Sequence, residues 1–144
     1  MPKVYLLAVG SGSSVDQHSN NITLFNLVEQ LNFPRQSWPP PGAILPLEMH
    51  AYLRLDAFEL NQKFELRFVL VGDNGLETPT NAFSHRSATP RYRTRTFGLP
   101  APPAPGGYEL RVEFRGHEGA IWQRDPMTWP LLVLQSEPRP SVTH

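Results

Sequence analysis

Hydroxyl, carboxylate and imidazole groups lie close together near the start of the chain, where GSGSS at 10–14 is followed by Asp16 and His18. A hydrolytic triad needs three such groups and oxyanion donors that converge in space, which neighbours in one turn do not supply. The GSGSS segment also lacks the third glycine of a dinucleotide motif and the lysine of a P-loop. We therefore expect a flexible, solvated turn here, with no phosphate site and no catalysis.

Metal-ligating residues are present but scattered. No two of the five histidines have the spacing of a metal-binding pair, and the four aspartates do not form the acidic loops that chelate calcium. The absence of cysteine excludes disulfides and thiolate ligands. We predict no enzymatic activity, no metal and no cofactor. The residues concerned are His18, His50, His85, His117, His144, Asp16, Asp56, Asp73 and Asp125.

A row of arginines is the sharpest surface feature. Arg91, Arg93 and Arg95 alternate with a tyrosine and two threonines, so they share one face of a predicted strand. Guanidinium groups about 7 Å apart can bind phosphates or an acidic partner. The alternative is a ladder of cross-strand ion pairs, each contributing about 0.2–1 kcal/mol, and the zero net charge of the chain favours this ladder. The carboxylates expected opposite the arginines are Glu65, Glu109 and Glu113.

Three tryptophans are candidates for ligand stacking or for the core. Trp38 and Trp122 lie in or beside predicted loops, where an indole ring can stack on a sugar. Trp129 belongs to an apolar segment and is expected in the core. The proline-rich stretches at 38–42 and 100–105 are predicted to be stiff connections between sheets, although polyproline segments can also be presented to partner domains.

The elements that must position these residues are predicted strands. In GGYELRVEFR at 106–115, apolar and charged residues alternate strictly after the two glycines, as in a strand with one buried face. KFELRFVL at 63–70 has a similar pattern, with four apolar residues opposite three charged ones. LEMHAYLRL at 47–55 alternates too, with His50 and Tyr52 expected outward. VYLLAV at 4–9 and WPLLVL at 129–134 are apolar strands, whereas ITLFNLVEQL at 22–31 fits a helix and a strand equally well. Tyr108 either makes a tyrosine-corner hydrogen bond or is an ordinary core ring.

Seven or eight short strands, separated by turn signals and two proline crossovers, predict an all-β fold of two packed antiparallel sheets with Greek-key connections. We expect one domain at residues 1–135 and a frayed tail at 136–144. Zero net charge argues against nucleic acid and acidic membranes, and the apolar run at 4–9 is too short for a membrane span or a signal-peptide core. A cytoplasmic, soluble protein is expected.

Three stretches resemble a family of small bacterial proteins of unknown function. They are SVDQHSNNITLFNLVEQLNFP, LPLEMHAYLRLDAFELNQKFELRFVLVGDNG and LPAPPAPGGYELRVEF, which together cover most of the chain from Val15 onward. The resemblance implies an immunoglobulin-like sandwich and a strand at ITLFNLV, and it supplies no catalytic residues.

The function expected from the sequence is a non-enzymatic interaction or assembly module with an unidentified protein partner. The candidate binding residues are Arg91, Arg93, Arg95, Trp38 and Trp122. Sandwich edges can pair with another chain, so a homodimer formed by strand addition is a further possibility. A domain that binds a small ligand or carbohydrate through Trp38 or Trp122 is the alternative.

Overall fold

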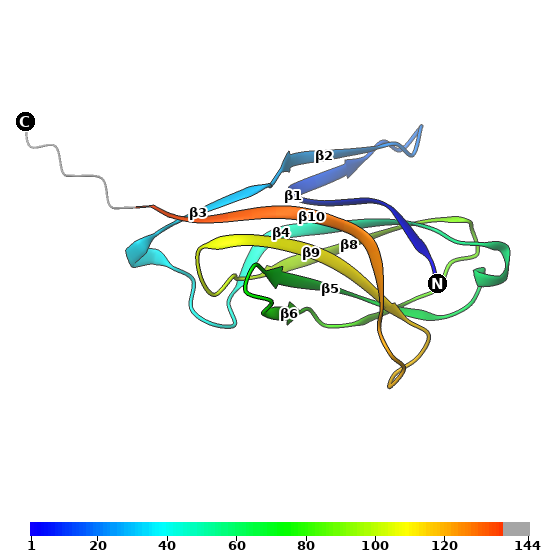
Figure 1. The fold of residues 1–144 in the computed structure, drawn as a ribbon. Helices are drawn as coiled ribbons and strands as arrows, with labels where there is room; N and C mark the ends of the chain where they lie inside the picture. Colours follow the sequence, from blue (N-terminus) through cyan, green and yellow to red (C-terminus); the bar gives the residue numbers. More distant parts are fainter. Residues whose placement is uncertain (137–144) are drawn as a thin grey trace, which may run out of the picture.

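The computed structural model describes residues 1–136, which form two β-sheets packed face to face (Figure 1). The predicted all-β sandwich is confirmed, although ten strands replace the seven or eight expected. Two short 3-10 turns, η1 (Arg35–Ser37) and η2 (Ala57–Glu59), accompany them. The strands are β1 (Lys3–Val15), β2 (Ile22–Leu27), β3 (Gln30–Pro34), β4 (Ile44–Arg54), β5 (Phe64–Gly72), β6 (Glu77–Pro79), β7 (Phe83–His85), β8 (Arg91–Pro100), β9 (Gly106–Arg115) and β10 (Gln123–Ser136).

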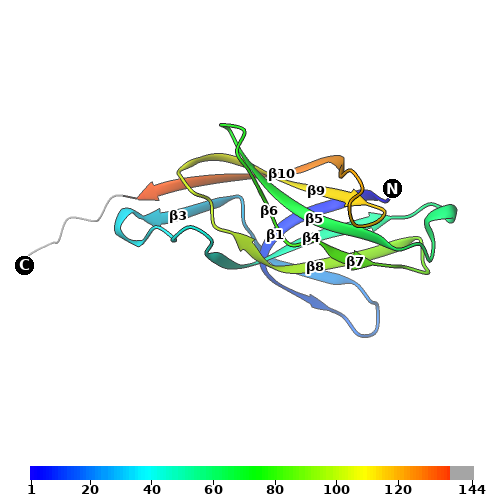
Figure 2. The same ribbon diagram turned by 90° about the horizontal axis from the view of Figure 1, so that it is seen from below.

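Each sheet combines strands that are not all consecutive along the chain. One sheet has four strands in the order β2-β1-β4-β8, and the other has six, with β3-β10-β9-β5-β6 in line and β7 also paired with β5. Neighbouring strands are antiparallel except β3 and β10, which run parallel. Both proline-rich segments connect one sheet to the other, as predicted, since 38–42 joins β3 to β4 and 101–105 joins β8 to β9 (Figure 2).

The core lies between the sheets and is filled by the alternate residues that the sequence placed inward. Phe64, Leu66, Phe68 and Leu70 of β5 are all buried, and so are the inward residues of β9 and β4. Burying such side chains on two facing layers is the main favourable contribution to folding. Those inward residues are Leu110, Val112, Phe114, Met49, Ala51 and Leu53.

Tyr108 fixes the entrance of the chain into β9. Its hydroxyl donates a hydrogen bond to the carbonyl oxygen of Ala104 at 2.6 Å, four residues upstream. This is the hydrogen bond of a tyrosine corner, the first of the two roles considered for this ring. The bond ties the second proline-rich connection to the start of the strand.

The first hairpin differs from the expectation. The predicted flexible turn at 10–14 is wrong, because β1 continues through these residues to Val15 and pairs with β2. A Cβ on Gly10 would lie 3.0 Å from the carbonyl oxygen of Phe25, so the glycine permits this close approach of the two strands. The turn itself lies at 16–21. The ambiguous segment 22–31 is extended, in β2 and the start of β3.

The last strand is longer than predicted. β10 begins at Gln123, contains an irregularity between Arg124 and Thr128, and ends at Ser136, which pairs with Pro34. The buried carboxylate of Asp125 lies in this irregular stretch and accepts hydrogen bonds from the backbone N–H groups of Val4 (3.0 Å) and Met127 (2.9 Å). Ser136 therefore belongs to the sheet and not to the tail, while 137–144 lie outside the described residues.

Candidate binding surface

The three arginines singled out in the sequence share one face of β8, as predicted. Arg91, Arg93 and Arg95 are exposed, whereas the intervening Thr94 is buried and its hydroxyl donates a hydrogen bond to the carbonyl oxygen of Ala51 at 2.8 Å. β8 is the last strand of the four-stranded sheet, and its only strand neighbour among the described residues is β4. The arginines therefore lie on the outer face of that sheet, beside β4.

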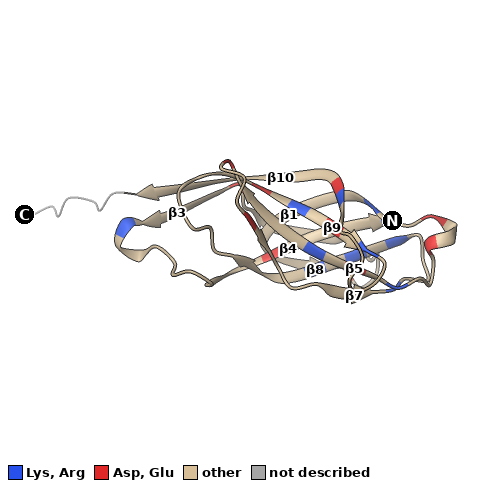
Figure 3. Cartoon of the chain, turned by 60° about the horizontal axis from the view of Figure 1, so that its bottom comes forward, with Lys and Arg blue, Asp and Glu red and all other residues tan. Residues whose placement is uncertain are grey.

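The carboxylates expected opposite these arginines lie on the other sheet, so that pairing is wrong. Glu65 of β5 pairs with Arg115 of β9, and Glu113 pairs with Arg67 through contacts of 2.7 and 2.8 Å. A ladder of cross-strand ion pairs exists between β5 and β9, but different arginines make it. Figure 3 marks the basic and acidic positions along the strands. β9 is inserted between β5 and β10, whereas β8 pairs with β4, and sequence alternation alone does not distinguish these neighbours.

The four-stranded sheet has a strong excess of positive charge. Its strands contain five basic residues and a single carboxylate, Glu48, while the strands of the six-stranded sheet contain four basic residues and five carboxylates. We call the five basic residues the basic face. They are Lys3, Arg54, Arg91, Arg93 and Arg95.

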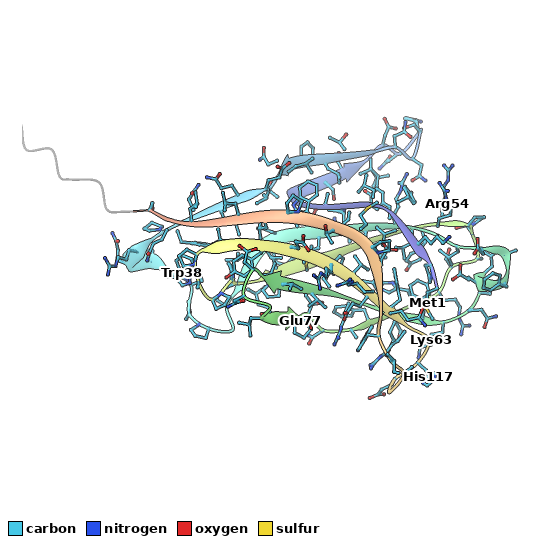
Figure 4. All side chains as sticks on the ribbon, in the orientation of Figure 1. Met1, Trp38, Arg54, Lys63, Glu77 and His117 are labelled. Carbon is cyan, nitrogen blue, oxygen red and sulfur yellow. The ribbon has the colours of Figure 1, made fainter. Side chains whose placement is uncertain are left out.

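Three members of the basic face stand side by side across three strands. Lys3 of β1 is in register with Arg54 of β4, which is in register with Arg91 of β8. In Figure 4, Arg54 projects on the side of β1 and Glu77 lies on the opposite side of the molecule. Like charges on neighbouring strands repel one another, so this arrangement costs stability unless an anion neutralises it.

The single carboxylate of this sheet is already engaged. Glu48 lies 3.1 Å from Nε2 of His50 and 3.5 Å from Arg95. Within residues 1–136, no carboxylate lies within ion-pair distance of Lys3, Arg54, Arg91 or Arg93. The basic face therefore retains several positive charges that the described part of the chain does not neutralise.

A hollow of about 330 Å³ lies in the basic face, between β4, β8 and the hairpin of β1 and β2. Arg93 and Arg95 line it together with His50 and Tyr52, and residues of the hairpin close one side. Such a hollow presents positive charge to a carboxylate or phosphate group. The hairpin residues are Ser13, Val15 and Ile22.

Two residues expected in water are instead buried beneath the basic face. His50 and Tyr52 do lie on the outer side of β4, but they are only 2% and 6% exposed. The guanidinium of Arg93 lies 5.7 Å from the centre of the Tyr52 ring, and the ring of Tyr5 packs edge-on against the Tyr52 ring. Burial raises the pKa of Tyr52, whose hydroxyl has no hydrogen-bond partner among the described residues. Two large rings within a charged, alternating strand were the signal that sequence reasoning overlooked.

The two loop tryptophans are occupied by contacts within the chain and do not line the hollow. Trp38 is half-buried against the core, with its ring edge-on to Phe33 at 5.2 Å. Trp122 packs on the guanidinium groups of Arg67 and Arg115, which lie 4.3 and 4.2 Å from its ring centre. The expected core position of Trp129 agrees with the structure, where its indole N–H donates to the carbonyl oxygen of Val28 at 2.8 Å.

The segment with Asp16 and His18 forms a turn. A side-chain oxygen of Asp16 accepts hydrogen bonds from the backbone N–H groups of His18 (2.8 Å) and Ser19 (3.1 Å), and these bonds lower the pKa of the carboxyl. The bonds hold the turn closed between β1 and β2. Among residues 1–136, no three histidine, aspartate or glutamate side chains gather as a metal site would require, and no described helix is long and apolar enough to cross a membrane.

No protein-family model matches this chain, and no curated protein matches it. The resemblance to small bacterial proteins of unknown function therefore stays a prediction. The basic face is defined by the geometry of the chain alone.

Proposed function

We propose that this protein is a non-enzymatic interaction module that binds an acidic partner protein through the basic face. The observation that carries the proposal is the uneven charge of the two sheets. In a chain whose net charge is zero, one sheet holds five basic residues against one carboxylate. A concentrated positive surface on a neutral protein attracts an anionic surface at short range and selects against basic partners.

An acidic protein fits this surface better than a nucleic acid does. The basic residues lie on neighbouring strands, and two of them, Arg93 and Arg95, line one hollow. The whole protein lacks the excess of positive charge that supports binding to a phosphate backbone. The two rings nearest the arginines, Tyr52 and Tyr5, are engaged with guanidinium groups and with each other. They are not free to stack on bases.

The proposal is tested by charge reversal at Arg93, an exposed member of the basic face. The chain is applied to a sulfonate matrix at low salt, and we expect Arg93→Glu to elute at clearly lower salt than the unsubstituted chain with an unchanged melting temperature. Arg124→Glu is the matched control, because Arg124 is exposed on β10 of the other sheet. Equal loss of retention in both variants would show that only total charge matters and would overturn the proposal.

We also propose that the sandwich is immunoglobulin-like and that the protein is cytoplasmic. The strand order supports the first point, since β4 and β8 lie in one sheet while β5, β9 and β10 lie in the other, with β3 parallel to β10 at the edge. The hydrogen bond of Tyr108 at the start of β9 supports it too. The absence of cysteine suits a reducing compartment.

Self-association by strand addition is a second candidate, and it is favoured at β2. This strand is the other edge of the four-stranded sheet and carries no charged residue. Phe25 and Leu27 are exposed along it, and the exposed Val15 of β1 pairs with Ile22 at its start. An uncharged, apolar edge is the kind that pairs with a second copy.

Carbohydrate binding through Trp38 or Trp122 stays an untested alternative. We favour the basic face over it because the rings of both tryptophans already contact side chains of the described chain. A sugar series that shifts tryptophan emission would support the alternative.

A further inference from the structure

The free edge of β8 adjoins the basic face. β8 ends the four-stranded sheet, and within residues 1–136 no strand pairs with its other side. Every second residue of such an edge turns its N–H and C=O groups away from the neighbouring strand. The edge of β5 in the opposite sheet is covered instead by β6 and β7. β8 therefore offers unpaired backbone groups directly beside its arginines.

The available part of this edge starts after the first two residues of β8. The hydroxyl of Tyr92 lies 3.0 Å from Nδ1 of His85 in β7, and the carbonyl oxygen of Arg91 accepts a hydrogen bond from the hydroxyl of Thr89. From Arg93 to Gly98 the described chain shows no such contact at the edge. This length suits a strand of about five or six residues.

An uncharged hollow of about 280 Å³ continues along the same edge, between the end of β8 and the segment of β6 and β7. Ile44, Phe83 and Phe97 line it and are 66%, 50% and 69% exposed. None of the lining residues is charged. Carbon surface left in water by three large side chains around one hollow is typical of a site that receives apolar side chains of another molecule.

We propose that β8 accepts an extended acidic segment of a partner protein as an added strand. In such a strand, alternate side chains point to opposite faces. Acidic side chains on the outer face would meet Arg93 and Arg95, and the intervening apolar side chains would point toward the hollow lined by Phe83. This inference rests on the proposed function and adds to it the mode of binding and the acidic-apolar alternation of the partner.

Charge complementarity selects this occupant over a second copy of the chain. Two β8 strands paired edge to edge would bring two rows of arginines onto one face, and like charges on neighbouring strands repel. An acidic strand instead gives each of Arg93 and Arg95 a carboxylate. Arg93 has no carboxylate within ion-pair distance among the described residues.

The test uses peptides of 10 residues, the length of β8, with glutamate and valine or threonine in alternation. Binding of the labelled peptide to the full chain is followed by fluorescence anisotropy. A second peptide of the same composition, with all glutamates in one block, has the same charge but no alternating faces. We expect the alternating peptide to bind at least about tenfold more tightly than the block peptide. We also expect Arg93→Glu to reduce the affinity of the chain for the alternating peptide more than Arg124→Glu does.

Backbone pairing is tested by N-methylating every second residue of the alternating peptide, in either of the two possible frames. One frame removes the N–H groups that face β8, so we expect about tenfold or greater loss, because several backbone hydrogen bonds disappear together. The other frame should bind within about twofold of the parent. Equal affinity of both frames would overturn strand addition, and so would failure of the alternating peptide to bind.

These outcomes separate the inference from the proposed function. If the block peptide binds as well as the alternating one and Arg93→Glu still abolishes binding, the basic face recognises acidic partners without an added strand. If Arg93→Glu and Arg124→Glu behave alike on both the peptides and the sulfonate matrix, the proposed function fails as well.

Discussion

Trp122 offers the sharpest test of whether a loop tryptophan serves the fold or a ligand. Its ring contacts the guanidinium groups of Arg67 and Arg115, which are themselves paired with Glu113 and Glu65. The two arginine side chains are 24% and 17% exposed, so they are largely shielded from water. Contacts of this kind contribute about 0.5–1 kcal/mol when exposed and about 2 kcal/mol or more when desolvated. For two intermediate contacts we expect about 2 kcal/mol in total.

We predict that Trp122→Ala lowers the free energy of unfolding by about 2 kcal/mol. With a urea dependence of about 2 kcal/mol per molar, this moves the unfolding midpoint down by about 1 M. The matched control is Ile121→Ala at the neighbouring position, where the side chain is 88% exposed and the change should stay below about 0.5 kcal/mol. Urea unfolding followed by circular dichroism measures both variants.

A double-mutant cycle isolates the contact itself. Arg67→Met is made alone and together with Trp122→Ala, and we expect a coupling energy of about 1 kcal/mol between the two positions. A coupling energy near zero between positions 67 and 122, together with a Trp122→Ala variant as stable as Ile121→Ala, would refute the role of Trp122 in stabilising the fold. If a sugar series also shifted the emission of the parent protein but not of Trp122→Ala, this residue would be a ligand platform.

Two further predictions concern acid sensitivity and self-association. Burial lowers the pKa of His85 in the folded chain. Below about pH 6.5 the unfolded chain therefore binds a proton more readily than the folded chain does, and the free energy of unfolding should decrease as the pH is lowered. His85→Gln should flatten this dependence below about pH 6.5 in urea titrations, and an unchanged slope would show that other groups cause it. Phe25→Lys places a charge on the apolar edge of β2 and should convert any dimer seen by light scattering to monomer, whereas a dimer that survives this change does not use β2.

The two-layer fold could be predicted because alternation is a local property. Successive residues of a strand point to opposite faces, so apolar residues at every second position all face the core. The structure buries the apolar residues of β5 and β9 in this way, among them Phe64, Phe68, Leu110 and Val112. The order of strands within each sheet could not be predicted, because every alternating strand has one apolar and one charged face and fits several neighbours equally well. The expected ladder therefore had the right chemistry and the wrong arginines.

The two residues missed at the candidate site were hidden for a related reason. In LEMHAYLRL, His50 and Tyr52 occupy the positions that a half-buried strand gives to water, and the alternation rule places them there. They are buried because other side chains lie against them: Tyr5 and Arg93 contact Tyr52, and Glu48 contacts His50. Residues of the hairpin of β1 and β2 line the same hollow. The hairpin is long because GSGSS at 10–14 pairs with β2 as part of a strand. Glycine and serine are typical of turns and show no apolar alternation, so the sequence did not predict this pairing.

The contrast between the two outer faces explains why a neutral protein can still be selective. On the six-stranded sheet each arginine of the ladder has a carboxylate within reach, so that face is satisfied by the chain itself. On the four-stranded sheet Arg93 lies between Arg91 and Arg95 on one face and has no carboxylate within ion-pair distance among the described residues. Because like charges held together lower stability, an anionic partner that relieves them gains binding free energy only at this face. Binding of the acidic peptide should therefore raise the melting temperature of the parent chain more than that of Arg93→Glu.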